Sequence, residues 1–401
     1  MNFTRATFAG IAIVLAGNVA AAYAADSACT PPTQITGSPE ETAWRIFVAA
    51  TCPTGNPHKY PFVTWETWIE QHQQYPTSST AKQSVSGAMT IERRFHRSPL
   101  GEIRKNPAAL ALPQGANTGC GPGGGDPSVT LCEEVRLNPG KGGTSEYVTK
   151  PAAGQTLEFR TQQAKFAASS PSSKPAIDFP TASVEIKADW IQLPTAACAQ
   201  TIKQNKIWIE YIGTQCYALA GMHLISKLTP NWIWATFEAQ NLPTNPQRCV
   251  VLGCNDPFGS DPAKTPPNQP GATTKITEVL KGLMVSAKLN TVWQNYRMDG
   301  VQTDFVDSSG NPILLGNSII EGENANVPLN SSSCITCHHA SSISAAGSES
   351  FGLGLLAKAP IGNPTSLPPG VFSRDFLWSL SLACPNSVFQ GCASAPPEKR
   401  H

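Results

Sequence analysis

The residues Cys334, Cys337 and His338 belong to the pentapeptide Cys-Ile-Thr-Cys-His, which combines two thiols and an imidazole within five positions. Two residues between the cysteines place both sulfur atoms on one side of a helical turn. In this spacing the thiols can add to the two vinyl groups of a haem, while the histidine binds the iron as proximal ligand. The pattern therefore predicts one covalently attached haem c.

The same pentapeptide could instead be a redox-active dithiol or half of a zinc site. A zinc site needs further ligands, but the sequence contains no second Cys-x-x-Cys and no pair of histidines three to five residues apart. A thioredoxin-type dithiol lies near a strand-helix-strand pattern, whereas here residues 330–333 (Asn-Ser-Ser-Ser) read as a loop that caps a helix. Haem attachment is the favoured interpretation.

Residues 1–24 have the features of a secretory signal peptide. Arg5 supplies a positive charge, residues 8–16 are apolar, and residues 22–24 (Ala-Tyr-Ala) form a small-x-small cleavage site. We expect a mature chain that begins near Ala25 and lies in the periplasm, because this kind of haem attachment is extracytoplasmic in bacteria. No later run of 18 or more apolar residues occurs, so no membrane span is expected after cleavage.

The chain has 12 cysteines, and the motif accounts for two of them. The even remainder in an exported chain indicates five disulfides. Neighbours in sequence would close short loops, which favours the pairings Cys120–Cys132, Cys249–Cys254 and Cys384–Cys392. The other four cysteines are Cys29, Cys52, Cys198 and Cys216.

The charge balance excludes some classes of partner. The chain has 29 Lys and Arg against 28 Asp and Glu, so its net charge is +1. This argues against nucleic acid or an anionic membrane, and leaves a redox partner protein or a small-molecule electron donor or acceptor. One basic group, at residues 93–97, is expected to be a solvated helix face, with a haem propionate contact or a docking patch as alternatives.

The hydrophobic patterns predict an α+β fold: a central antiparallel β-sheet, flanking helices and long loops held by disulfides, with the haem segment near the C-terminus. Residues 184–190 alternate strictly between the two faces of a strand, and residues 206–212, 217–226 and 232–238 are rich in aromatic and β-branched side chains. These four segments are the expected strands of the sheet.

Helices are predicted at three places. One begins after Ser38, where Pro39 and Glu41 complete a capping box, and a second begins near Thr64. The longest amphipathic pattern covers residues 274–296 and is expected to pack on the haem region. The expected organisation is a signal peptide (1–24), a helical and loop-rich region (25–180), a β-sheet region (181–254), a Pro/Gly linker (255–272) and a haem-attachment region (273–401).

At residues 334–338 the chain resembles the c-type cytochromes. Longer phrases, at residues 221–227, 231–238, 314–321 and 375–378, are similar to those of bacterial proteins described as cytochrome c family. The small soluble cytochromes c place a methionine ligand downstream of the attachment motif. No Met follows Met298 here, so the small cytochrome fold is disfavoured.

A distal ligand, if the iron has one, is expected from upstream of the motif. His223 is the leading candidate, because it lies in a predicted strand and shares a face with Tyr217, Leu219 and Ile225, while Met222 points to the other face. The alternative reading of His223 is a core histidine bonded to a backbone carbonyl. An open or water-bound sixth position is an equal alternative.

Other polar or sulfur-containing side chains receive structural interpretations. His72 and Met284 are expected in the core, and His58 and His96 on the surface. The three charged side chains Glu185, Lys187 and Asp189 share one strand face. We expect that face to be solvated, with a polar cluster beside a haem propionate or substrate as the alternative.

These observations predict a periplasmic monohaem c-type cytochrome that acts in electron transfer. The rival is a haem-dependent oxidoreductase or peroxidase with an open distal site, because the chain is several times longer than an electron carrier requires. In that case His223 or Glu185 would act as an acid or base. A third possibility is a sensor that binds a ligand at the haem.

Overall fold

The computed structural model describes residues 28–54, 62–75, 131–170, 177–212, 215–240, 247–269, 274–324, 327–348 and 360–386. The expected signal peptide, the basic group at residues 93–97, His58 and His96 lie outside these residues. Within the described ranges, no helix has the length and apolar composition that a bilayer crossing requires.

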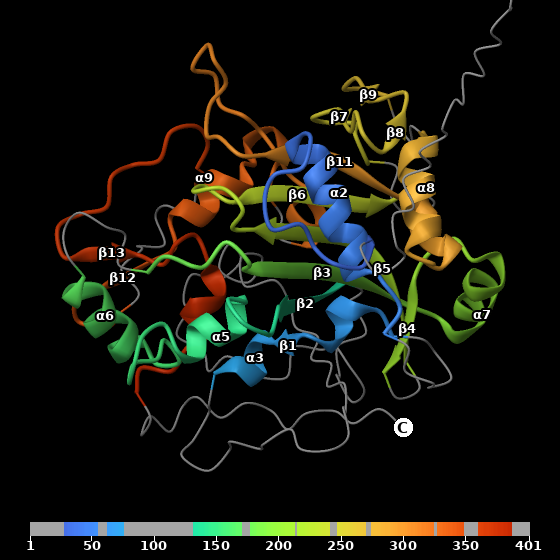
Figure 1. The fold of residues 1–401 in the computed structure, drawn as a ribbon. Helices are drawn as coiled ribbons and strands as arrows, with labels where there is room; N and C mark the ends of the chain where they lie inside the picture. The colour runs from blue at the N-terminus through green and yellow to red at the C-terminus, as the bar shows by residue number, and fades with distance from the viewer. Residues whose placement is uncertain are drawn as a thin grey trace, which may run out of the picture.

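A seven-stranded sheet forms the centre of the described part of the chain (Figure 1). Six strands follow one another in the order β1-β2-β3-β5-β6-β11, β4 pairs with β5, and every pairing is antiparallel. The mixed helix and sheet fold with a central antiparallel sheet is therefore confirmed. The strands are β1 (Ile69–Glu70), β2 (Leu131–Leu137), β3 (Val184–Leu193), β4 (Ile209–Ile212), β5 (Gln215–Ser226), β6 (Ile233–Ala239) and β11 (Tyr296–Gln302).

Three short strand pairs lie outside the sheet. They are β7 (Cys254–Asn255) with β9 (Lys264–Thr265), β8 (Ser260–Asp261) with β10 (Lys275–Ile276), and β12 (Ser342–Ser344) with β13 (Val371–Ser373). The segment expected as a linker thus contains short paired strands. The central sheet takes β1 and β2 from the expected N-terminal region and β11 from the expected haem-attachment region.

The described helices are short. The α-helices are α2 (Pro39–Ala50), α3 (Gln71–Gln74), α5 (Thr144–Thr149), α6 (Arg160–Ser169), α7 (Thr195–Gln204), α8 (Glu278–Ser286) and α9 (Cys334–His339). The 3₁₀ and π-helical segments are η1 (Thr64–Thr67), η3 (Thr291–Asn295), η4 (Ser318–Asn324), η5 (Leu329–Ser331) and η6 (Trp378–Leu382). Helix α2 begins where the capping box predicts, since the Glu41 N–H donates to Ser38 Oγ at 3.1 Å.

Two of the predicted helices were too long. The one expected from Thr64 is the 3₁₀ segment η1 followed by β1, because the backbone at Ile69–Glu70 pairs with β2 instead of continuing a helix. The one expected over 274–296 is limited to α8, because Lys288 adopts a left-handed conformation (φ +54°) and β11 then begins at Tyr296. Helix α8 packs against α2.

Two apolar clusters cover opposite faces of the sheet. Strand β6 shows the alternation, since Ile233 and Phe237 belong to one cluster and Trp234 to the other. The first cluster contains the buried side chains of α2 and α8, and the second contains Cys334 and Ile335 of α9. The attachment motif therefore lies against the sheet face opposite to α2 and α8.

Three disulfides within the described residues close short loops of the chain. The bonded pairs are Cys29–Cys52, Cys198–Cys216 and Cys249–Cys254, the last of which was predicted. Cys132 and Cys384 are also disulfide-bonded, and their expected partners, Cys120 and Cys392, lie outside the described residues.

Candidate functional site

Helix α9 carries the attachment motif, and strand β11 holds its first turn. Ser333 is the N-cap residue, but its side chain makes no hydrogen bond to the helix backbone N–H groups. Instead, the N–H of Ile335 donates to Gln302 Oε1 at 3.1 Å, and Gln302 Nε2 donates to Ser333 Oγ at 2.9 Å. This satisfies one of the N–H groups that a helix start leaves unpaired. The central sheet thereby fixes the position of Cys334.

Cys334 and Cys337 both retain thiols, whereas the eight other cysteines among the described residues are disulfide-bonded. Cys334 is buried, and its Sγ lies 3.5 Å from the carbonyl oxygen of Leu315. Burial is the largest cause that raises the pKa of this thiol well above its ordinary value. Cys334 is therefore held as the neutral thiol, whereas Cys337 is half-buried.

The imidazole of His338 is oriented by one hydrogen bond and one ring contact. Its Nδ1 lies 2.9 Å from the carbonyl oxygen of Phe376, and the ring centroid of Trp234 lies 4.5 Å from that of His338. Burial lowers the pKa of His338 to about 4, so the ring is neutral at pH 7. Because a carbonyl only accepts, Nδ1 carries the proton and Nε2 the lone pair, which is the form that binds a metal.

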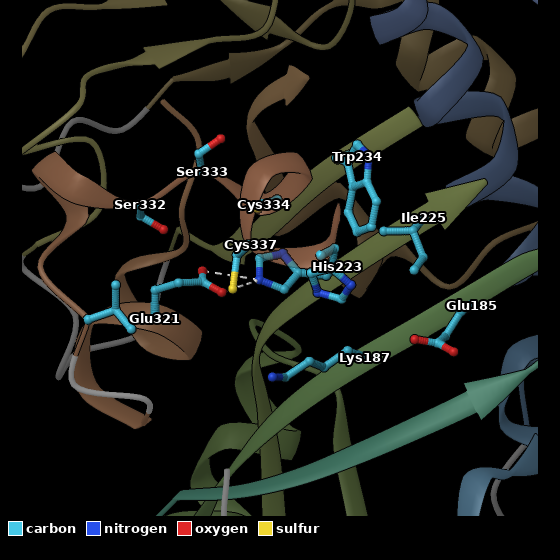
Figure 2. Close-up of a pocket in the computed structure, with 13 residues that line it drawn as sticks. Glu185, Lys187, His223, Ile225, Trp234, Glu321, Ser332, Ser333, Cys334 and Cys337 are labelled. Atoms are coloured by element: carbon cyan, nitrogen blue, oxygen red, sulfur yellow. Dashed lines mark hydrogen bonds and ion pairs between the residues drawn. The ribbon is translucent and has the colours of Figure 1, made fainter. Parts of the chain in front are cut away.

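A cavity between α9 and the sheet brings the predicted site residues together (Figure 2). Its empty volume is about 790 Å³, counting the open mouth. Cys334, Cys337 and His338 line it from α9, His223 lines it from β5, and Lys187 lines it from β3. Residues more than 100 positions apart in sequence thus face one space.

A β-bulge in β5 decides which side chains face the cavity. Asp189 of β3 pairs with Gly221 and the next residue, Trp190, pairs with Leu219, so Ala220 of β5 has no partner residue in β3. The side chains before and after Ala220 therefore alternate out of phase with each other. The expectation that Tyr217 and Leu219 share the face of His223 was therefore wrong. Both lie in the apolar core on the opposite face, together with Met222. Of the two adjacent candidates, His223 is the one that lines the cavity.

The remaining ligand candidates do not reach this cavity or are not described. Met284 of α8 is buried in the cluster on the opposite sheet face, as expected of a core residue. His72 lies in α3, and its side chain is outside the described part. His339 is half-buried, and its ring packs edge-on against Phe305 and Phe376.

The charged strand face of β3 is largely buried, contrary to the expectation of a solvated face. Asp189 is fully buried, and Glu185, which also lines the cavity, is 5% exposed and accepts a hydrogen bond from Ser379 Oγ at 2.7 Å. Burial raises the pKa of Glu185 to about 7. Burial is the largest single cause and lowers the pKa of Lys187, but the charges of Glu133, Asp189 and Glu321 together outweigh it, so the net pKa is raised. The Glu133 carboxylate lies 2.7 Å from Lys187 Nζ.

Glu321 is the cavity residue that the sequence analysis missed. It belongs to η4, a π-helical segment, and its two carboxylate oxygens lie 2.9 and 3.1 Å from Nε2 of His223. Burial raises the pKa of Glu321, but His223, Lys187 and the N–H of Asn317 outweigh burial and lower it below its ordinary value. The carboxylate is therefore charged at pH 7. Single π-helical turns frequently occur at functional sites, but no residue pattern in the sequence predicts that Ser318–Asn324 forms one.

Comparison of the chain with protein-family models, with curated proteins and with solved structures finds no match in any of the three. The function is therefore inferred from the site itself.

Proposed function

We propose that this chain is an exported, periplasmic monohaem c-type cytochrome that acts in electron transfer. One observation carries the proposal: α9 presents two thiols and an imidazole to a single cavity, and the Phe376 carbonyl holds Nδ1 of that imidazole. The disulfides of the described residues agree with an oxidising compartment. When bound, a covalent haem c would supply one-electron chemistry at its iron.

The residues of this chain have distinct roles in that proposal. Cys334 and Cys337 would form the two thioether bonds, and His338 would bind iron through Nε2. The hydrogen bond from Nδ1 to Phe376 fixes the tautomer and increases the basicity of the ligating nitrogen. Trp234 packs on the His338 ring and, with Ile225, gives the cavity an apolar wall that limits access of water.

A specific observation favours a second candidate, a haem oxidoreductase or peroxidase with an open distal site. The cavity is lined by groups that can accept or donate protons: the His223–Glu321 pair, and Glu185 with its pKa raised to about 7. Groups with a pKa near the working pH are suited to general acid–base catalysis. In this candidate, His223 would be a proton carrier and not an iron ligand.

Covalent attachment is tested on protein that is produced with a cytochrome c maturation system. We expect the colour to stay with the protein during acid–acetone extraction, and to be lost from a variant with both Cys334→Ser and Cys337→Ser. The matched control combines Cys249→Ser with Cys254→Ser, which removes a disulfide outside the cavity and is expected to keep the haem. Colourless wild-type protein after maturation would contradict the proposal.

The visible spectrum then separates the two candidates. Six-coordinate, low-spin iron that does not react with peroxide or carbon monoxide supports an electron carrier. Five-coordinate, high-spin iron in the resting protein, with peroxide-dependent turnover, supports the enzyme. In both candidates the partner is a redox protein or a small-molecule electron donor or acceptor.

A further inference from the structure

The His223–Glu321 pair is largely shielded from water. The side chains are 11% and 15% exposed, and both carboxylate oxygens are within hydrogen-bond distance of one ring nitrogen, Nε2 (Figure 2). Because a carboxylate accepts and does not donate, Nε2 carries the proton. The lone pair of a neutral His223 ring therefore lies on Nδ1.

The backbone around Glu321 is fixed by Asn317. The N–H of Asn317 donates to the Glu321 carboxylate at 2.7 Å, and Asn317 Nδ2 donates to Thr236 Oγ1 of β6 at 2.8 Å. Asn317 Oδ1 accepts the N–H of Ile319 at 2.9 Å, at the start of η4. The close approach of Asn317 to β5 depends on Gly221, where a Cβ would lie 2.8 Å from Asn317 Oδ1. The sheet therefore holds the Glu321 carboxylate in place through Asn317, which is itself bonded to β6.

From this arrangement, and on the basis of the proposed function, we infer that Glu321 is a positioning residue that makes Nδ1 of His223 the sixth ligand of the haem iron. Nε2 is occupied by Glu321, so the ring can bind a metal only through Nδ1 unless the buried carboxylate loses its partner. A histidine that binds a metal commonly donates its other ring N–H to a carboxylate, which fixes its orientation and strengthens it as a donor.

The charge of Glu321 has a predictable effect on the iron. A carboxylate bonded to the ligand N–H increases electron donation from the ring, and its negative charge favours the more positive, ferric state. Both effects stabilise the ferric state and so lower the midpoint potential. Burial keeps water and salt from screening the charge. Removal of the charge is therefore expected to shift the midpoint potential in the positive direction and to weaken the electron donation that His223 would supply to the iron.

The test uses full-length, haem-loaded protein and the variant Glu321→Gln, which keeps the shape and an acceptor oxygen but removes the charge. We expect altered g-values in the electron paramagnetic resonance spectrum of the ferric protein and a positive shift of the midpoint potential. The matched control is Glu238→Gln. Glu238 accepts from the N–H and Oγ of Ser318, also in η4, whereas the carboxylate that bonds His223 is that of Glu321, so the Glu238 variant is expected to keep the wild-type g-values.

A double-variant cycle separates this role from a purely structural one. His223→Ala is expected to lose the low-spin signal, and adding Glu321→Gln in that background is expected to change the g-values no further. Should Glu321→Gln fail to fold, Glu321→Asp provides a second test. Its side chain is shorter by one methylene group, so the carboxylate lies farther from His223 and the g-values are expected to change in the same direction.

The failures of the two proposals are distinguishable. Unchanged g-values in Glu321→Gln, or an unchanged spectrum in His223→Ala, with the covalent haem still present, would overturn the positioning role and leave the cytochrome assignment intact. Wild-type protein without covalent haem would overturn the cytochrome assignment and this inference together. Equal changes in Glu321→Gln and Glu238→Gln would mean that the turn, and not the charge, controls the iron, which also overturns the inference.

Discussion

Phe376 adopts a left-handed backbone conformation (φ +73°), and its carbonyl oxygen lies 2.9 Å from Nδ1 of His338. Bulky residues rarely tolerate this conformation. The preceding Asp375 is also left-handed (φ +51°), and its carboxylate accepts from Lys227 Nζ at 2.6 Å and from the Phe179 N–H at 2.7 Å. Buried contacts therefore retain a strained turn, and the turn directs a carbonyl oxygen at the proposed proximal imidazole.

The strain at Phe376 can be measured with two substitutions that remove the same ring. Phe376→Ala and Phe376→Gly are both expected to lower the free energy of unfolding by about 3–5 kcal/mol, because the buried ring is lost. The glycine variant is expected to be the more stable of the two by about 1 kcal/mol, because glycine adopts a positive φ without a Cβ penalty. Urea unfolding of both variants checks this, and equal stabilities would show that the turn is not strained.

A second pair of substitutions tests the close approach of Asn317 to β5. In Gly221→Ala the new Cβ would lie 2.8 Å from Asn317 Oδ1, so we expect a loss of about 1–3 kcal/mol of stability and a disturbed visible spectrum. The control is Gly282→Ala in α8, where a Cβ meets nothing within 4 Å. That change is expected to stabilise the protein by about 0.5–1 kcal/mol, because alanine favours a helix. Similar losses in both variants would contradict the specific role of Gly221.

Local patterns were sufficient to predict part of this structure. The strict alternation of residues 184–190 identifies β3, and the capping box at Ser38 identifies the start of α2. These features depend on neighbours in sequence, which a single sequence displays. The expected capping loop before Cys334 is in part the 3₁₀ segment η5, and the Ser333 side chain does not cap α9. His223 lies in a strand as expected, but a strand offers two faces, and the bulge at Ala220 changes which residues share the face of His223.

Features that depend on distant partners could not be predicted in the same way. Strand β2 contains Glu133, Glu134 and Arg136, a composition that is typical of surface segments. All three are buried, because Arg136 pairs with Glu134 and Lys187 pairs with Glu133. Glu321 was missed for the same reason, since its partner His223 is 98 positions away.

The pH dependence of stability provides a test of the buried carboxyl group Glu185. Burial raises its pKa to about 7 in the folded protein, against an ordinary value of 4.5. The folded state then holds this proton to a higher pH than the unfolded state does, so the contribution of Glu185 to stability falls as the pH rises from about 4.5 to about 7. The full decrease corresponds to about 3 kcal/mol.

Glu185→Gln removes this titration, so its stability relative to wild type is expected to be more favourable at pH 8 than at pH 5. Urea unfolding of both proteins at the two pH values gives the difference in free energy of unfolding between variant and wild type. Groups that titrate identically in the two proteins do not contribute to this difference. The surface control is Glu278→Gln, whose side chain is 84% exposed and which is expected to keep the wild-type pH dependence. A Glu185→Gln variant that parallels wild type at both pH values would show that Glu185 remains ionised in the folded protein, with Ser379 and Lys187 compensating for its burial.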